Sequence, residues 1–203
     1  MSSVFLSGFG VSAGLIMAIG AQNAHVLRQG LKREHVTMTI LVCALCDAIL
    51  ILIGVAGLGG VFSANPDWMA VARYGGAAFL GWYGLRALQS ALRGGAALVQ
   101  GEETRRGLTR RQALLAAAGF SLLNPHAYLD TVVLIGSIGS QQAEDVRHLF
   151  AAGAVTASFV WFFLLGYGAR ALRPVFSRPM AWRVLDALVC AMLWAIAASL
   201  LLR

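Results

Sequence analysis

The stretch Ile19-Gly-Ala-Gln-Asn-Ala-His25 interrupts the first apolar run of the chain with hydrogen-bonding side chains. A helix that spans a bilayer consists mainly of apolar residues, because the hydrocarbon satisfies no polar group. The stretch Leu122-Leu-Asn-Pro-His126 interrupts a later apolar run in the same way. Both contain Asn-x-His, beginning at Asn23 and at Asn124, an offset of 101 residues in a chain of 203. This spacing predicts a duplication with one polar break in each copy.

The composition is typical of a membrane protein. Hydrophobic residues make up 59% of the chain and charged residues only 12%, whereas soluble domains carry about 25% charged residues. The mean hydropathy is +0.73. Several apolar stretches exceed the roughly 18 residues that are needed to cross about 30 Å of hydrocarbon. We therefore expect an all-α, polytopic membrane protein embedded in the lipid bilayer.

Six transmembrane helices are expected, three in each copy. Residues 1–93 form the first repeat and residues 112–203 the second, joined by the Gly-rich and charged linker 94–111. Because each copy has three spans, the second copy enters the membrane from the opposite side, so the halves are predicted to be inverted repeats, as in many secondary transporters. The expected spans are residues 4–26, 37–62, 68–92, 112–136, 148–170 and 181–202.

The basic residues alternate between the two sides of this arrangement. Thirteen of the 16 Lys and Arg residues border the first, third and fifth connections, and only Arg73, Arg147 and Arg203 fall on the other side. The positive-inside rule then places these three connections in the cytoplasm and both termini outside. The net charge of +7 is thus explained by topology, and nucleic acid is not an expected partner.

Asp47 is the sharpest single candidate for function. It lies about ten residues into the second span, roughly 15 Å deep and close to the bilayer midplane. A carboxylate there costs at least about 2.5–3.5 kcal/mol on insertion scales, so it should face the bundle interior. It either carries a proton or a cation, or forms an ion pair that only fixes packing. Arg73 in the third span is one partner within reach, although its side chain could equally extend to the outer headgroups.

Asp130 follows the break in the fourth span and is the second candidate. Pro125 removes a helical hydrogen bond there, and broken backbone at membrane depth is tolerated where it lines a wet cavity. A half-helix after the break would direct its N–H groups at an anion, such as a substrate carboxylate. The alternative is a simple proline kink. Asn124 and Asp130 are nearly two turns apart, so one ligand contacts both only if the helix bends.

The break in the first span offers a matching set of groups. Gly20 marks the break, and Gln22 and Asn23 supply hydrogen-bonding side chains beside it. If the halves pack about their pseudo-symmetry axis, Asn23 and Asn124 should approach one cavity. By helical rise alone, Asn23 lies only about five residues before Arg28. That spacing predicts a cavity nearer the cytoplasm than Asp47.

Other features carry weaker expectations. Asp186, early in the sixth span, is expected either to be functional or only to be hydrated near the cytoplasmic end. Gly10, Gly14 and Ala18 form a four-spaced stripe of small residues, which predicts close helix packing along that face. His25 could relay protons, or it could be a hydrogen-bonded structural imidazole.

Cys43-x-x-Cys46 has the spacing of a thiol-redox pair, but it lies in the middle of an apolar helix, where thiol reactivity falls. No metal-ligand cluster, phosphate-binding loop or nucleophile–base arrangement occurs in the sequence. We therefore expect no metal, no cofactor and no enzymatic activity.

Several of these motifs resemble those of LysE-type exporters of basic amino acids. Residues 20–35, GAQNAHVLRQGLKREH, are similar to the family's first-span signature, and residues 124–131, NPHAYLDT, to its span-four signature. Asp47 with Gly54-Val-Ala-Gly57, and residues 165–170, LGYGAR, match as well. The similarity covers essentially the whole chain, and the motifs together are far more specific than any one alone.

The resemblance implies export of L-lysine, L-arginine or both through the inner membrane of a bacterium, by proton antiport. Related exporters of neutral amino acids have a Pro-Gly-Pro-type break in the first span, where this chain has Gly20-Ala-Gln22. They also favour Lys at the position of His126. Both departures favour the basic-substrate branch. A homo-oligomer is compatible with the sequence.

The residues themselves fit a cationic substrate. Asp47 and Asp130 are the carboxylates well inside the spans, and Gln22, Asn23, Asn124 and freed backbone N–H groups would bind the substrate carboxylate. If Asp47 binds either a proton or the substrate, it couples the two. The alternatives are export of another cationic or polar metabolite, an intramembrane thiol-redox carrier that uses Cys43 and Cys46, and a helical scaffold without transport.

Overall fold

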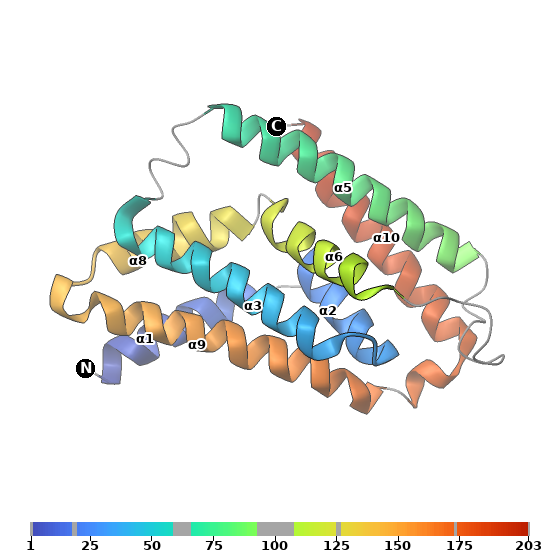
Figure 1. Ribbon diagram of the computed structural model, residues 1–203, viewed down its shortest axis with the longest axis horizontal. Helices are drawn as coiled ribbons and strands as arrows, with labels where there is room; N and C mark the ends of the chain where they lie inside the picture. The colour runs from blue at the N-terminus through green and yellow to red at the C-terminus, as the bar shows by residue number, and fades with distance from the viewer. Residues whose placement is uncertain are drawn as a thin grey trace.

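The computed structural model describes residues 2–17, 20–58, 66–92, 108–124, 127–172 and 174–202, with the backbone alone for residues 58, 66–73, 129 and 177. Within these ranges all regular structure is helical (Figure 1). The elements are α1 (Ser2–Ile16), α2 (Ala21–Lys32), α3 (Val36–Ile53), η1 (Gly54–Leu58), α5 (Pro66–Leu92), α6 (Arg110–Leu122), η3 (Tyr128–Ile135), α8 (Gly136–Ser140), α9 (Glu144–Gly168), η4 (Ala169–Leu172), η5 (Val175–Ser177) and α10 (Pro179–Leu202).

Several helices have the length and composition of membrane spans. In the described ranges, Val36–Gly57, Glu144–Leu172 and Pro179–Leu202 each qualify alone, and α1 and α2 qualify together as one bent span. Large apolar side chains face outward on these helices, for example Ile49 and Leu188, which are 57% and 64% exposed. An outward apolar surface suits lipid. The chain is a multi-pass helical membrane protein, and the count of six spans stays a prediction.

Both polar breaks coincide with the end of a helix. The expected first span, residues 4–26, is two helices: α1 ends at Ile16, α2 begins at Ala21, and their axes differ by 82°. Gly20 between them is extended, with φ −122° and ψ 177°. The expected fourth span, residues 112–136, is likewise divided, because α6 ends at Leu122 and η3 begins at Tyr128. Pro125 and His126 lie outside the described residues.

The helices of the two halves pack reciprocally. Helix α1 of the first half lies against α9 of the second half, and α6 of the second half lies against α3 of the first half. After the breaks, α2 also contacts α9, while η3 contacts α3. The remaining helices pair across the halves, α3 with α9 and α5 with α10, and Figure 1 shows α5 and α10 running together along one edge of the bundle. Each of these contacts between unlike elements thus has a counterpart in the other half.

Glycines lie at two of these reciprocal contacts. A Cβ placed on Gly30 of α2 would collide with the backbone carbonyl of Gly166 near the end of α9. A Cβ placed on Gly136, at the start of α8, would collide with the backbone of Gly54 at the end of α3. Small residues let helix backbones approach closely in a membrane. The four glycines therefore set how closely each broken span crosses the helix beneath it.

The predicted packing stripe on α1 is wrong. A Cβ on Gly10 or Gly14 would meet nothing within 4 Å, and Ala18 lies outside the described residues. The face that packs contains Gly8 and Ser12, both buried, and Ser12 Oγ donates a 3.0 Å hydrogen bond to a backbone carbonyl of α9. Gly10 and Gly14 are four residues apart, and so are Gly8 and Ser12, so the spacing alone could not decide which face of α1 packs against a neighbouring helix.

The basic side chains gather at one end of the bundle. Figure 1 shows that α2 and α9 end, and α3, α6 and α10 begin, on the same side of the molecule. We call this side the basic end. The described basic residues at these helix ends are Lys32, Arg33, Arg110, Arg111, Arg170, Arg178 and Arg183.

Candidate functional site

A cavity of about 260 Å³ lies where the two helix breaks meet. Its walls come from both halves of the chain, from α1, α2 and α3 on one side and from η3, α9 and α10 on the other. The lining residues are Leu15, Ile16, Gly20, Gln22, Asn23, Asp47, Asn124, Ala127, Asp130, Thr131, Phe162 and Ile196.

Six of the eight residues expected from the sequence to form the site line this cavity. They are Gly20, Gln22, Asn23, Asp47, Asn124 and Asp130. The other two are Arg73, whose side chain lies outside the described part of the structure, and Pro125, which lies outside it entirely. The expected pair between Asp47 and Arg73 therefore stays a prediction.

Asp47 is buried on the inner face of α3, with 3% of its surface exposed. Gln22, in the first turn of α2, donates from Nε2 to Asp47 Oδ1 at 3.1 Å and to Ser121 Oγ at 3.0 Å. Ser121 Oγ in turn donates to the carbonyl of Ala117 at 2.9 Å. A buried carboxylate needs such donors, since an unpaired one is costly. Ser121 was missed in the sequence, although a hydroxyl three residues before Asn124 in an apolar run was a readable signal.

Asn23 holds the first break together. Its Nδ2 donates a 2.7 Å hydrogen bond to the carbonyl of Ile16, one of the last carbonyls of α1, which has no partner within its own helix. Its Oδ1 accepts a 3.2 Å hydrogen bond from Trp161 Nε1 of α9. One side chain thereby connects the end of α1, the start of α2 and the neighbouring α9. Trp161 was also missed, because nothing in the surrounding sequence shows which way its side chain points from the helix.

The second break places its polar groups in the same cavity. The carbonyl of Asn124 accepts a 3.0 Å hydrogen bond from the N–H of Ala127, which starts the next helical turn. Asp130 lies in the first turn of η3, and Thr131 Oγ1 donates to the carbonyl of Ala127. Because the helix is broken between α6 and η3, Asn124 and Asp130 both reach the cavity despite the six residues between them.

The cavity combines opposite electrostatic features. Asp47 and Asp130 supply two carboxylates, which interact electrostatically. The first residues of α2 and η3 also line it. The first N–H groups of a helix have no intrahelical partner and carry partial positive charge. The site can therefore hold a cation and a carboxylate at once, which is the charge pattern of a basic amino acid.

The expected depth of the cavity is wrong. Asn23 was placed nearer the cytoplasm than Asp47 by counting helical rise along a single straight span. In the structure Asn23 and Asp47 line the same cavity. The rise from Asn23 to Arg28 gives a position along α2 alone, and it does not say where Asp47 on α3 lies beside that helix.

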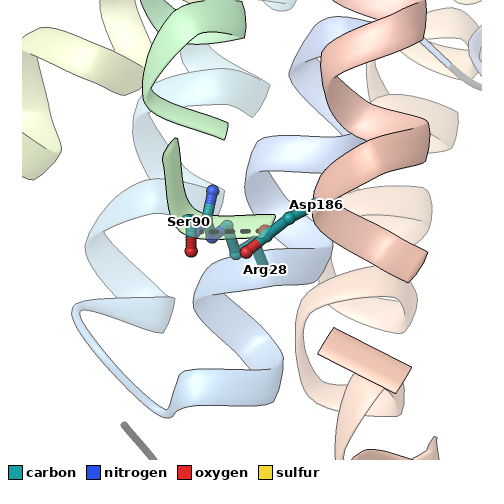
Figure 2. A network of polar contacts seen from close by, with 3 residues as sticks. All are labelled: Arg28, Ser90 and Asp186. Atoms are coloured by element: carbon teal, nitrogen blue, oxygen red, sulfur yellow. Dashed lines mark hydrogen bonds and ion pairs between the residues drawn. The ribbon is translucent and has the colours of Figure 1, made fainter. Parts of the chain in front are cut away.

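Of the two alternatives left open for Asp186, functional or merely hydrated, simple hydration is wrong. Its side chain is only 2% exposed, and Oδ1 lies 3.2 Å from Nη2 of Arg28 in an ion pair (Figure 2). The bend after α1 carries Arg28 on α2 against α10, which a straight first span would not do. His25 is buried as well, with its ring 4.9 Å from that of Phe120.

The cysteines show no sign of redox pairing. Cys43, Cys46 and Cys190 are all free thiols, and Cys43 is fully buried in α3. Among the described residues, no group of three or more His, Cys, Asp or Glu side chains could hold a metal ion.

Broken membrane helices around a polar cavity with paired carboxylates are the features of a small-molecule transporter. The chain belongs to the LysE type translocator family, whose match covers residues 13–203. It is an amino-acid transporter and not an enzyme, as the sequence motifs indicated.

Named relatives cover almost the whole chain. The chain is 43% identical over 203 residues to the arginine exporter protein ArgO of Yersinia enterocolitica, covering 98% of this chain and 97% of the relative. It is 45% identical over 190 residues to the putative amino-acid transporter YggA of Aeromonas salmonicida, covering 93% and 91%. A YggA protein of Aeromonas hydrophila is 45% identical over 178 residues, covering 88% and 78%. No solved structure matches the chain.

Proposed function

We propose that the protein exports basic amino acids, L-arginine and also L-lysine, across the bacterial inner membrane in exchange for protons. The observation that carries this proposal is the single cavity that holds Asp47, Asp130 and the starts of α2 and η3. The relative from Yersinia enterocolitica, similar over nearly the full length, is named an arginine exporter.

The proposed binding mode follows from the charges in the cavity. The guanidinium or ammonium group of the substrate binds to Asp47 and Asp130, because a cation in a low-dielectric site needs a carboxylate. The substrate carboxylate binds at the starts of α2 and η3, whose first N–H groups have no partner within their own helix. Asn124 supplies a further polar contact in the same wall.

Proton exchange follows from the membrane potential. Moving one positive charge outward against an inside-negative potential costs about 2.3 kcal/mol per 100 mV. One proton moving inward for each cation moving outward cancels this cost. Asp47 is the coupling group in this proposal, since its buried carboxylate binds either a proton or the substrate cation.

We also propose the architecture of two inverted three-helix repeats, residues 1–93 and 112–203, with both termini outside. The reciprocal packing of α1 on α9 and α6 on α3 supports it. The glycine contacts of α2 with α9 and of α8 with α3 support it as well. The basic end, in this proposal, faces the cytoplasm.

Counterflow in proteoliposomes tests the function. Vesicles loaded with unlabelled L-arginine should take up labelled L-arginine and L-lysine, and excess neutral amino acids should not compete. An imposed proton gradient should drive uphill accumulation. Equal competition by neutral amino acids would overturn the proposed substrate class, and accumulation that ignores the proton gradient would overturn antiport. Exchange of a different organic cation, without arginine or lysine, would indicate another cationic metabolite.

A further inference from the structure

A second buried carboxylate lies outside the cavity. Figure 2 shows Asp186 of α10, Arg28 of α2 and Ser90 of α5 converging from three helices. Asp186 Oδ1 lies 3.2 Å from Arg28 Nη2, and the same Nη2 donates a 3.4 Å hydrogen bond to Ser90 Oγ. This contact is an ion pair between Arg28 and Asp186. It joins helices from both halves of the chain.

The pair lies between the cavity and the basic end. Arg28 is six residues beyond Gln22 on α2, about 9 Å along the helix. Asp186 is ten residues before Ile196 on α10, about 15 Å along that helix. Gln22 and Ile196 both line the cavity, and both displacements lead toward the basic residues at the end of α2 and the start of α10. A substrate that comes from the basic end along α2 or α10 therefore passes this pair.

The contact between the two charged groups is incomplete. Asp186 Oδ1 forms no hydrogen bond of good geometry in the structure, although its side chain is only 2% exposed. Arg28 keeps 25% of its side chain exposed. A buried carboxylate is costly without a cation. Here Arg28 contacts the carboxylate through one nitrogen, and part of the Arg28 side chain is exposed. A guanidinium held through one nitrogen is bound less strongly than one in a bidentate pair.

Two more buried polar groups lie on α2 near the pair, His25 between the pair and the cavity and Gln29 one residue beyond Arg28. His25 and Gln29 are 7% and 2% exposed. His25 Nε2 and Gln29 Oε1 have no hydrogen-bond partner among the described residues. With Gln22 they are spaced three and four residues apart, so they share one face of α2. Buried polar atoms without partners are uncommon and call for an explanation, and a route for a polar solute supplies one.

We propose that Asp186 is a second subsite for the cationic group of the substrate, between the cytoplasm and the cavity. Arg28 occupies it when no substrate is bound, and the substrate guanidinium or ammonium displaces Arg28. The inference rests on the proposed export of basic amino acids. The exchange conserves charge, because one cation replaces another on the carboxylate and Arg28 moves toward solvent at the basic end. Neutral amino acids cannot make this exchange, so the pair also contributes to selectivity.

Uptake of labelled L-arginine into inside-out membrane vesicles tests the proposal, since the cytoplasmic face is then outermost. Arg28→Gln removes the internal competitor and should lower the half-saturating concentration several-fold. Asp186→Asn removes the subsite and should raise it about tenfold, the typical effect of losing a charge-assisted hydrogen bond. The double variant should behave like Asp186→Asn alone. Arg183→Gln removes an exposed arginine of α10 and should leave the half-saturating concentration unchanged.

A purely structural ion pair gives a different pattern. Each single variant would then leave one buried charge unpaired and impair the protein, and the double variant would recover. That result would overturn the proposal, as would an unchanged half-saturating concentration in Asp186→Asn. Uptake is normalised to the amount of folded protein, measured by size-exclusion chromatography. The variant Asp186→Glu keeps the carboxylate and should retain the preference for arginine over its neutral isostere citrulline. If wild-type vesicles take up no basic amino acid, the proposed function itself fails and this inference with it.

Discussion

Gln22 donates hydrogen bonds to Asp47 Oδ1 at 3.1 Å and to Ser121 Oγ at 3.0 Å. This one side chain connects the first turn of α2, the middle of α3 and the end of α6. The hydrogen-bond donor to the buried carboxylate is thus a neutral amide. An amide carries no charge, so this bond does not neutralise Asp47, and the carboxylate can still bind a proton or a substrate cation.

Replacing Gln22 should weaken substrate binding. Gln22→Leu keeps most of the volume but removes both hydrogen bonds, and a hydrogen bond to a charged group contributes about 1.5–3 kcal/mol. We expect the half-saturating concentration in counterflow to rise by about tenfold or more. Ser121→Ala keeps the bond to Asp47 and should have a smaller effect. Equal losses in the two variants would show that the bond to Asp47 has no special importance.

Asp47→Asn should abolish uphill export. The amide is close in size to the carboxylate but cannot bind a proton or balance a substrate cation, so the step that couples the two is lost. The measurement is accumulation of labelled L-arginine driven by a proton gradient. The matched control is Asp145→Asn, an exposed carboxylate in the first turn of α9, which should transport normally. Uphill export at the wild-type rate by Asp47→Asn would rule out its role in coupling.

Asn23 and Trp161 should show graded effects. Asn23→Ala removes both the contact to the end of α1 and the contact to α9. Trp161→Phe removes only the second. We expect the transport rate to fall further in Asn23→Ala than in Trp161→Phe, because a misplaced helix start no longer faces the substrate. Trp82→Phe, at a tryptophan that is 60% exposed, should have little effect. A larger loss in Trp161→Phe than in Asn23→Ala would contradict this ranking.

The glycine crossings predict a difference in stability. Gly30→Ala and Gly136→Ala each place a methyl group against backbone atoms of a neighbouring helix, and overpacking of this kind costs about 1–3 kcal/mol. Thermal unfolding in detergent should therefore begin at a lower temperature in both variants. Gly10→Ala adds a methyl group that meets nothing within 4 Å and should leave unfolding unchanged or delay it slightly. Lower stability in Gly10→Ala alone would reverse the assignment of the packed face.

The cysteines should be dispensable for transport. A variant with Cys43→Ala and Cys46→Ala should retain counterflow of L-arginine, since neither thiol lines the cavity and both are free cysteines. The measurement is the initial counterflow rate per amount of folded protein. Complete loss of exchange in a variant that still folds would support the alternative hypothesis of an intramembrane thiol-redox carrier.

Some parts of the site were readable because lipid makes polar residues conspicuous. Gln22, Asn23, Asp47, Asn124 and Asp130 are polar side chains in apolar runs, and a bilayer penalises each unless it faces a protein interior or a wet cavity. Their convergence in one cavity agrees with that reasoning. Ser121 and Trp161 were harder to find, because a hydroxyl can satisfy itself on its own helix and tryptophan is common in membrane proteins.

By itself the sequence determined the helical class, the membrane environment, the family motifs and the two positions where helices break. Composition decides whether a segment can lie in lipid, and local backbone chemistry decides where a helix ends. Only the tertiary structure decided which faces meet: Gly8 and Ser12 rather than Gly10 and Gly14, and Arg28 against Asp186. Helix periodicity defines a face but not the neighbour that covers it. An 82° turn between α1 and α2 redirects every residue that follows.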